Sequence, residues 1–118
     1  MSDLSDLSAH ARYPLLTEIQ STARRLQGKV LETPVWRWQT GAALQLDAGT
    51  QVWLKLELFQ ITGTFKVRGA LNSIEHMDAS ARARGVVAAS AGNHAMAVAY
   101  AAKVAGVGAK LAMPATAS

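Results

Sequence analysis

The amino-acid sequence predicts an α/β fold with an open parallel sheet. Residues 86–90 are a short apolar run with two adjacent valines, which predicts a buried strand. Residues 94–105 are rich in alanine and contain no helix breaker. Residues 109–113 form a second apolar run, which ends at Pro114. A strand, a helix and a strand joined by tight turns form a βαβ unit, in which the helix carries the chain back so that the two strands run parallel.

Helical periodicity predicts two further helices upstream. The first begins near Thr17, with Gln20 as its capping-box partner, and ends at Gly28. The second runs over residues 65–77. The residues expected on the buried face of the first helix are Leu16, Ile19, Ala23 and Leu26, and those expected on the second are Phe65, Ala70, Leu71, Ile74 and Met77.

Alternation of apolar and polar residues predicts a strand over residues 51–58, with Val52, Leu54, Leu56 and Leu58 on one face. Pro34 restricts the residue before it to extended conformations, so residues 34–38 are expected to form a strand or an extended loop. The other expected elements are a loose segment over the first dozen residues, short helices over 41–47 and 78–84, and a turn over 61–64.

The composition places the chain among folded cytoplasmic proteins. Half of the 118 residues are hydrophobic and 17% are charged, which is typical of a globular domain and not of a disordered one. The absence of cysteine excludes a disulfide scaffold, a cysteine-ligated zinc site and a thiol nucleophile. The acidic first residues do not resemble a signal peptide, and Lys103 interrupts the most apolar stretch, so we expect no membrane partner.

The net charge of +4 comes from the second half of the chain. Residues 1–60 hold equal numbers of acidic and basic residues, whereas residues 61–118 hold six bases and two acids. This asymmetry indicates an anionic ligand bound by the second half. The bases are scattered and not interleaved with aromatic residues, so we do not expect a nucleic-acid partner.

Lys66 stands in the first turn of its predicted helix, where the helix dipole disfavours a cation by about 0.3–1 kcal/mol. If its side chain is buried, its pKa could fall from about 10.4 to roughly 7–8, where an amine serves as nucleophile and general base. The alternative is a surface lysine that follows an ordinary N-cap at Thr64. Position alone favours this surface lysine.

A second turn before a helix, at residues 90–94, predicts an anion site. Small residues there leave backbone N–H groups free at the carboxyl end of a parallel strand, where ligands of open α/β sheets bind. The turn is not a dinucleotide-binding G-x-G-x-x-G motif, and His94 taken alone is typical of a structural histidine. The sequence contains no triad order or metal-binding spacing, so we expect no metal site.

Three segments together resemble one family of enzymes. Residues 54–60, 62–70 and 90–95 have the order and spacing of motifs in the serine/threonine dehydratases, which are pyridoxal-phosphate enzymes sharing the fold of the tryptophan synthase β-subunit. The resemblance extends from about Leu16 to the last residue and covers about the opening third of that family. It implies a truncated form of the fold and makes Lys66 a functional residue.

The resemblance implies specific roles for six residues. Lys66 would form a Schiff base with pyridoxal phosphate and remove the Cα proton of the substrate. Phe65 would pack beside the cofactor ring, and Asn93 would hydrogen-bond its phenolic oxygen. The residues that would hold the substrate carboxylate are Ser90, Gly92 and His94. The implied reaction is β-elimination of water from L-threonine or L-serine, which gives a 2-oxo acid and ammonia.

Three positions bear on how closely the chain follows the family. Related racemases carry a serine where this chain has Ala91, so one-face elimination is favoured over racemisation. Thr64 stands where serine is commoner, and its hydroxyl is retained. Met96 and the residue after it replace the usual Gln-Gly pair.

The resemblance also implies the domain organisation. Residues 1–84 would belong to the large cofactor domain, residues 85–118 would begin the small domain, and the complete protein would be a homo-oligomer. The glycine-rich loop for the cofactor phosphate would lie downstream. Two alternatives stay open: an inactive fragment that acts as an association module, or a related pyridoxal-phosphate lyase or racemase acting on another hydroxy-amino acid.

Overall fold

The α/β fold is present in the computed structural model, which describes residues 13–39, 46–47 and 49–117. The elements in chain order are α1 (Leu16–Leu26), β1 (Val35–Trp38), β2 (Val52–Lys55), the 3₁₀-helix η3 (Glu57–Phe59), α2 (Lys66–Glu75), α3 (Ala79–Arg84), β3 (Val86–Ala89), α4 (Asn93–Ala105) and β4 (Ala109–Ala112). The expected loose segment over the first dozen residues, and most of the helix expected over 41–47, lie outside the described residues.

The βαβ unit predicted for the end of the chain is confirmed. Strands β3 and β4 pair in parallel, with Val86 opposite Ala109 and Ala89 opposite Ala112, and α4 connects them. Helix α4 ends at Gly106, whose φ of 65° is left-handed, as expected for a glycine that stops a helix.

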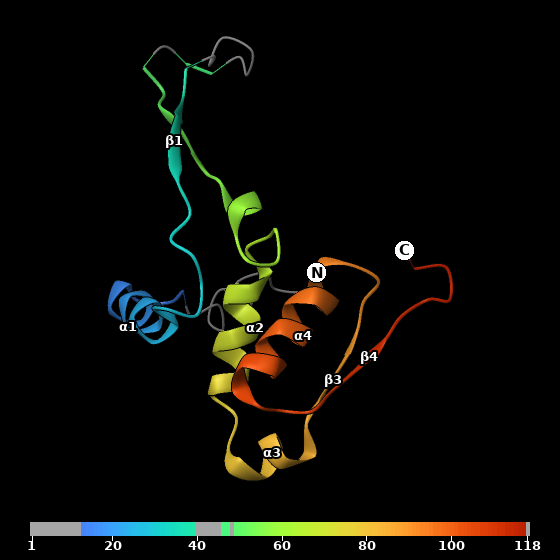
Figure 1. Cartoon of the computed structure of the whole chain (residues 1–118). Helices are drawn as coiled ribbons and strands as arrows, with labels where there is room; N and C mark the ends of the chain where they lie inside the picture. Colours follow the sequence, from blue (N-terminus) through green and yellow to red (C-terminus); the bar gives the residue numbers. More distant parts are fainter. Residues whose placement is uncertain (1–12, 40–45, 48, 118) are drawn as a thin grey trace, which may run out of the picture.

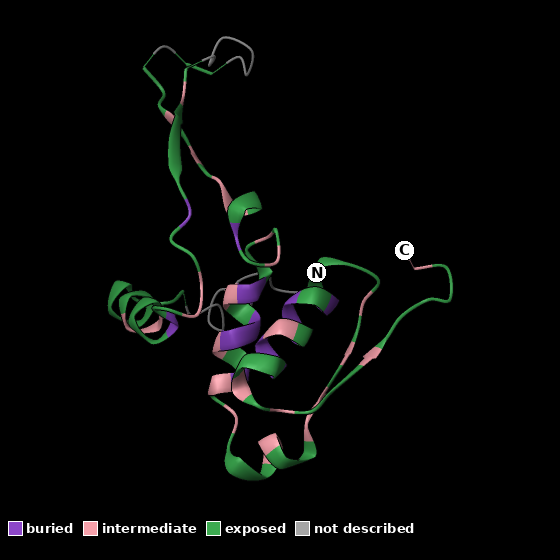
Figure 2. Cartoon of the chain, viewed as in Figure 1, coloured by how far each residue is buried: buried purple, intermediate pink, exposed green. Residues whose placement is uncertain are grey.

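The core lies between α2 and α4, which run side by side in Figure 1. Figure 2 shows most of the buried residues gathered on these two helices. The members of the cluster are Leu26, Val67, Ala70, Leu71, Ile74, Ala97, Val98, Ala101 and Ala102. Alanines on α4 allow a close approach, so its alanine-rich sequence serves packing as well as helix formation.

Helices α2 and α3 confirm the predicted segments, with differences at their ends. Phe65 was expected in the core but is 63% exposed, because it precedes the first turn of α2. Val67 is fully buried instead. Asp78 begins α3, and its carboxylate accepts a hydrogen bond from the Ala81 N–H at 2.8 Å.

The predicted cap and buried face of α1 are wrong. The Glu18 carboxylate accepts a hydrogen bond from the Leu15 N–H at 2.7 Å, so the helix begins one residue before Thr17. Leu26 is buried, but Leu16 is 68% exposed and Ile19 is also exposed. Periodicity identifies the apolar face of α1, but only the last turn of the helix meets the core.

Strands β1 and β2 pair antiparallel and project from the body as an arm (Figure 1). The arm makes the molecule open: its radius of gyration is 18.5 Å, whereas a compact domain of this length has about 13 Å. The alternation predicted for β2 is confirmed up to Leu56, but the strand ends at Lys55 and Leu58 is exposed on η3.

The expectation that β3 is buried is wrong for this chain. Val87 is 79% exposed, because α4 packs against the other face of the strand and no described residue covers this one. None of the described helices has the length and apolar character needed to cross a membrane.

Candidate active site

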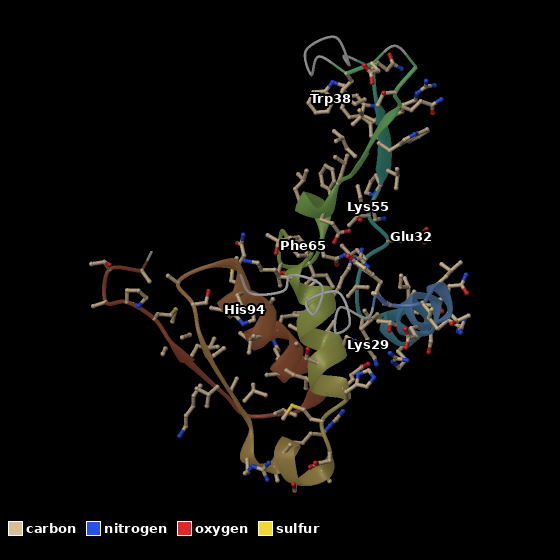
Figure 3. The ribbon with its side chains drawn as sticks, turned by 180° about the vertical axis from the view of Figure 1, so that it is seen from behind. Lys29, Glu32, Trp38, Lys55, Phe65 and His94 are labelled. Atoms are coloured by element: carbon tan, nitrogen blue, oxygen red, sulfur yellow. The ribbon has the colours of Figure 1, made fainter. Side chains whose placement is uncertain are left out.

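Lys66 is the first residue of α2 and lies between two cavities. One, of about 460 Å³, lies between α2, β3 and α4 and includes His94 in its lining. The other, of about 560 Å³, lies between β2, η3 and the start of α4 and includes Asn93. Phe65 and Lys66 line both, so this pair forms the boundary between them. Figure 3 shows Phe65 above the start of α2, with His94 on the neighbouring helix.

Lys66 is exposed, so the structure does not show the buried side chain that the sequence analysis considered as one alternative. Its backbone N–H donates a long hydrogen bond of 3.4 Å to the Thr64 hydroxyl. Phe65 occupies the N-cap position of α2 and makes no side-chain capping bond, so Thr64 is not the ordinary N-cap that the surface-lysine alternative assumed.

The turn before α4 leaves the start of that helix open. Gly92 is the N-cap, and within the described residues no side chain caps this helix. The Ser90 hydroxyl accepts a hydrogen bond from the Gly92 N–H at 3.2 Å, and Asn93 and His94 are exposed. Free N–H groups and the positive end of the helix dipole favour an anion here.

The structure therefore brings four of the six predicted site residues around shared cavities. Phe65 and Lys66 come from the start of α2, and Asn93 and His94 from the start of α4. Ser90 and Gly92 belong to the turn that leads into α4 but are not among the residues lining either cavity.

A polar cluster next to the site was not predicted from the sequence. The Glu57 carboxylate accepts hydrogen bonds from Arg68 Nε at 2.9 Å and Arg68 Nη2 at 2.8 Å, and it also accepts one from the Thr33 hydroxyl. These bonds, chiefly those from Arg68, lower the pKa of Glu57 from its usual 4.5 to about 2. The same pair raises the pKa of Arg68 above its usual value.

Gln60 extends this cluster to the segment before β1. Its side-chain amide accepts a hydrogen bond from the Leu31 N–H and donates one to the Leu31 carbonyl, both at 2.9 Å. Gln60 and Thr33 are buried, and Lys55 Nζ donates to the Thr33 carbonyl. A buried glutamine could have been suspected only from its place within a family motif, because it follows no periodic pattern.

Comparison with known proteins identifies the class of protein. The family profile described as "pyridoxal-phosphate dependent enzyme" matches residues 26–118. The chain belongs to this family, and the fold predicted from the resemblance is confirmed by solved structures of its members.

Two curated relatives and one solved structure show the degree of similarity. A provisionally named threonine dehydratase from Sinorhizobium fredii is 45% identical over 96% of the chain and 31% of that protein. L-threonine ammonia-lyase from Thermotoga maritima is 43% identical over 84% of the chain and 24% of that protein. The structure of maize serine racemase superposes with a TM-score of 0.72 and 40% identity over 85% of this chain and 30% of that one. The chain spans less than a third of the length of these proteins.

The site residues fit part of pyridoxal phosphate. Lys66 would supply a primary amine for the aldehyde, and Asn93, in the lining of the second cavity, would supply an amide for the phenolic oxygen. The open start of α4 suits a carboxylate. The phosphate is not provided for by this chain, because the glycines after Gly69 are isolated and form no consecutive run that could make a backbone nest.

Proposed function

We propose that the protein carrying this chain is a pyridoxal-phosphate-dependent dehydratase that eliminates water from L-threonine or L-serine. The products are a 2-oxo acid and ammonia. The observation that carries the proposal is the position of Lys66 between cavities lined by Asn93 and His94. Relatives named for threonine dehydration or deamination, at 43–45% identity, support it.

In this proposal Lys66 has two tasks. Its Nζ holds the aldehyde of the cofactor and later takes the Cα proton of the substrate. When bound, the cofactor withdraws electrons from Cα and so makes that proton acidic. The presence of Lys66 in the lining of both cavities supports it as the acceptor of this proton.

The other predicted residues orient the two ligands. Ser90, Gly92 and His94 would hold the substrate carboxylate through the polar groups of the turn and the N–H groups at the start of α4. Asn93 would bind the phenolic oxygen of the cofactor, and Phe65 would cover one side of its ring. The sharing of Phe65 between the two cavities supports its place beside the ring.

Racemisation is the second candidate, because a serine racemase is among the similar structures. Racemisation needs a second acid on the opposite side of the substrate. Ala91, in the turn where related racemases carry serine, has no proton to donate. This position favours elimination.

The decisive experiment uses the complete protein. Borohydride reduction followed by peptide mapping is expected to show a pyridoxyl adduct on Lys66, and Lys66→Arg is expected to abolish release of 2-oxo acid. An adduct on another lysine, or full turnover by Lys66→Arg, would contradict the proposal. Assaying both 2-oxo acid and D-amino acid over a panel of β-hydroxy-amino acids separates the dehydratase from the racemase.

We further propose a cytoplasmic homo-oligomer in which residues 1–84 belong to the large domain and residues 85–118 begin the small one. Exposed apolar residues on the arm and on β3, such as Trp36 and Val87, support association. Light scattering of the complete protein tests the oligomeric state, and cell fractionation tests the location. The 118-residue chain by itself would be an association module if it self-associates without binding cofactor or releasing 2-oxo acid.

A further inference from the structure

The turn that presents Lys66 has little apolar packing of its own. Ile61 is 41% and Phe65 63% exposed, and the buried hydroxyl of Thr62 has no hydrogen-bond partner among the described residues. The Gly63 N–H donates to the Gln60 carbonyl at 2.7 Å, which closes the turn locally. Apart from Val67, which is buried on the first turn of α2, polar contacts across the turn therefore help to set the direction in which α2 leaves it.

The Glu57–Arg68 ion pair spans this turn. Glu57 begins η3, eleven residues before Arg68, and Arg68 lies on the first turns of α2, two residues after Lys66. The two parallel hydrogen bonds fix both the distance and the orientation of the guanidinium group. Closing the 57–68 segment in this way constrains the residues between its ends, including Lys66.

The carboxylate end of the pair is itself held in place. Gln60 binds both backbone groups of Leu31, and the Thr33 hydroxyl donates to Glu57. Arg68 Nη2 also donates to the Leu31 carbonyl at 3.1 Å. The start of α2 is thus fixed to the segment before β1 through polar contacts.

We propose that Glu57 is a positioning residue for Lys66, acting through its two-point ion pair with Arg68. The inference rests on the proposed role of Lys66 as the residue that holds the cofactor. Glu57 lines the cavity of about 560 Å³, but its two carboxylate oxygens are occupied by hydrogen bonds from Arg68 and Thr33, so in this account it acts through Arg68 and not on a ligand. It holds the first turn of α2 so that the amine stays at the boundary between the two cavities.

The first test compares two charge-neutralised variants of the complete protein. Glu57→Gln removes the ion pair at the start of α2. Glu75→Gln is the matched control, because it removes the ion pair between Lys29 and the last residue of α2. The two carboxylates are similarly covered, with 15% and 19% of their side chains exposed.

We expect Glu57→Gln to lower kcat about ten- to one-hundred-fold while KM changes less than about twofold, because small displacements of a reacting group slow chemistry more than they weaken binding. Glu75→Gln is expected to lower the melting temperature but to keep kcat within about twofold of the parent. Equal losses of kcat in both variants would overturn the proposal, because the effect would then be one of general stability.

Hydrogen exchange on the cofactor-free protein gives a readout that does not depend on activity. In Glu57→Gln, the backbone amides of residues 61–68 are expected to exchange about tenfold faster or more, whereas Glu75→Gln leaves them unchanged. Unchanged exchange of this segment in Glu57→Gln would overturn the proposal. If the parent protein forms no adduct on Lys66, the proposed function fails, while the exchange result still decides whether the pair holds the turn.

Arg68→Lys provides a milder variant if Glu57→Gln does not fold. It keeps the positive charge but loses the fork that makes two parallel bonds. Arg68→Lys is expected to lower kcat and to speed hydrogen exchange over residues 61–68. The double variant, with both Glu57→Gln and Arg68→Lys, is expected to have a kcat no lower than that of Glu57→Gln alone, because both changes break the same ion pair. The proposal would be contradicted if the two changes lowered kcat independently, so that their effects multiplied in the double variant. It would also be contradicted if Arg68→Lys kept the kcat of the parent protein.

Discussion

The backbone of Gly85 faces the carbonyl oxygen of Gly108 so closely that a Cβ on Gly85 would lie 2.6 Å from it. Gly85 also has a φ of 81°, and the Val86 N–H next to it donates to the Gly108 carbonyl at 2.8 Å. The parallel pair of β3 and β4 therefore begins at a contact between two backbones that has no room for a side chain.

Gly85→Ala is expected to destabilise the protein by about 2 kcal/mol or more, because it combines a left-handed backbone with an overlap against main chain. Chemical denaturation measures the loss. Gly69→Ala on α2 is the control, since its Cβ meets no atom within 4 Å. In a helix interior this change is expected to be neutral or to stabilise by up to about 1 kcal/mol. An equal loss of free energy of unfolding in both variants would contradict the conclusion that the close contact between Gly85 and Gly108 leaves no room for a side chain.

The free energy of unfolding is expected to fall in acid, because the folded protein stabilises the ionised carboxylate of Glu57. Its folded-state pKa of about 2 lies below its usual 4.5, so the folded state favours the carboxylate. Its contribution to the free energy of unfolding is present above pH 4.5 and is lost as the pH falls towards 2.

Denaturant unfolding of the parent and of Glu57→Gln between pH 6 and pH 2 isolates this contribution. The difference in free energy of unfolding between the two proteins should shrink as the pH falls. A difference that does not depend on pH would show that the carboxylate is not stabilised by folding.

The Tyr100 hydroxyl connects α4 to the segment after α1, since it donates to the Lys29 carbonyl at 3.2 Å. Tyr100→Phe removes this bond without changing the ring, and it is expected to lower the free energy of unfolding by about 0.5–1.5 kcal/mol. Tyr13→Phe serves as the control, because Tyr13 is 84% exposed. The hydrogen bond would contribute nothing if the two variants unfolded at the same denaturant concentration.

Ala91→Ser tests the choice between elimination and racemisation. The new hydroxyl would stand in the exposed turn before α4, at the position where the family resemblance implies a serine in racemases. In the complete protein we expect D-amino acid to become detectable while 2-oxo acid release continues. In the reaction with L-serine, chiral chromatography measures the D-amino acid and a dehydrogenase-coupled assay measures the 2-oxo acid. Racemisation by the unchanged protein would contradict the argument from Ala91.

Local signals were sufficient for α2, α3, α4, β3 and β4. Two of these elements are bounded by residues that act on their own backbone, namely Asp78 at the start of α3 and Gly106 at the end of α4. The burial of β3 and α1 could not be predicted in the same way. Val87 and Leu16 look like core residues in the sequence, but burial depends on which other segments cover them.

The fold class, the place of Lys66 at the start of a helix and the motif that contains Asn93 could all be predicted from the amino-acid sequence, because they depend on residues close together in the chain. Two features could not be predicted in this way: Lys66 lines cavities together with residues from the start of α4, and Glu57 pairs with Arg68 beside it. Such contacts join segments whose separation follows no helical or strand period. Their geometry arises when the helices pack and the connecting turns close, so no pattern of neighbouring residues encodes it.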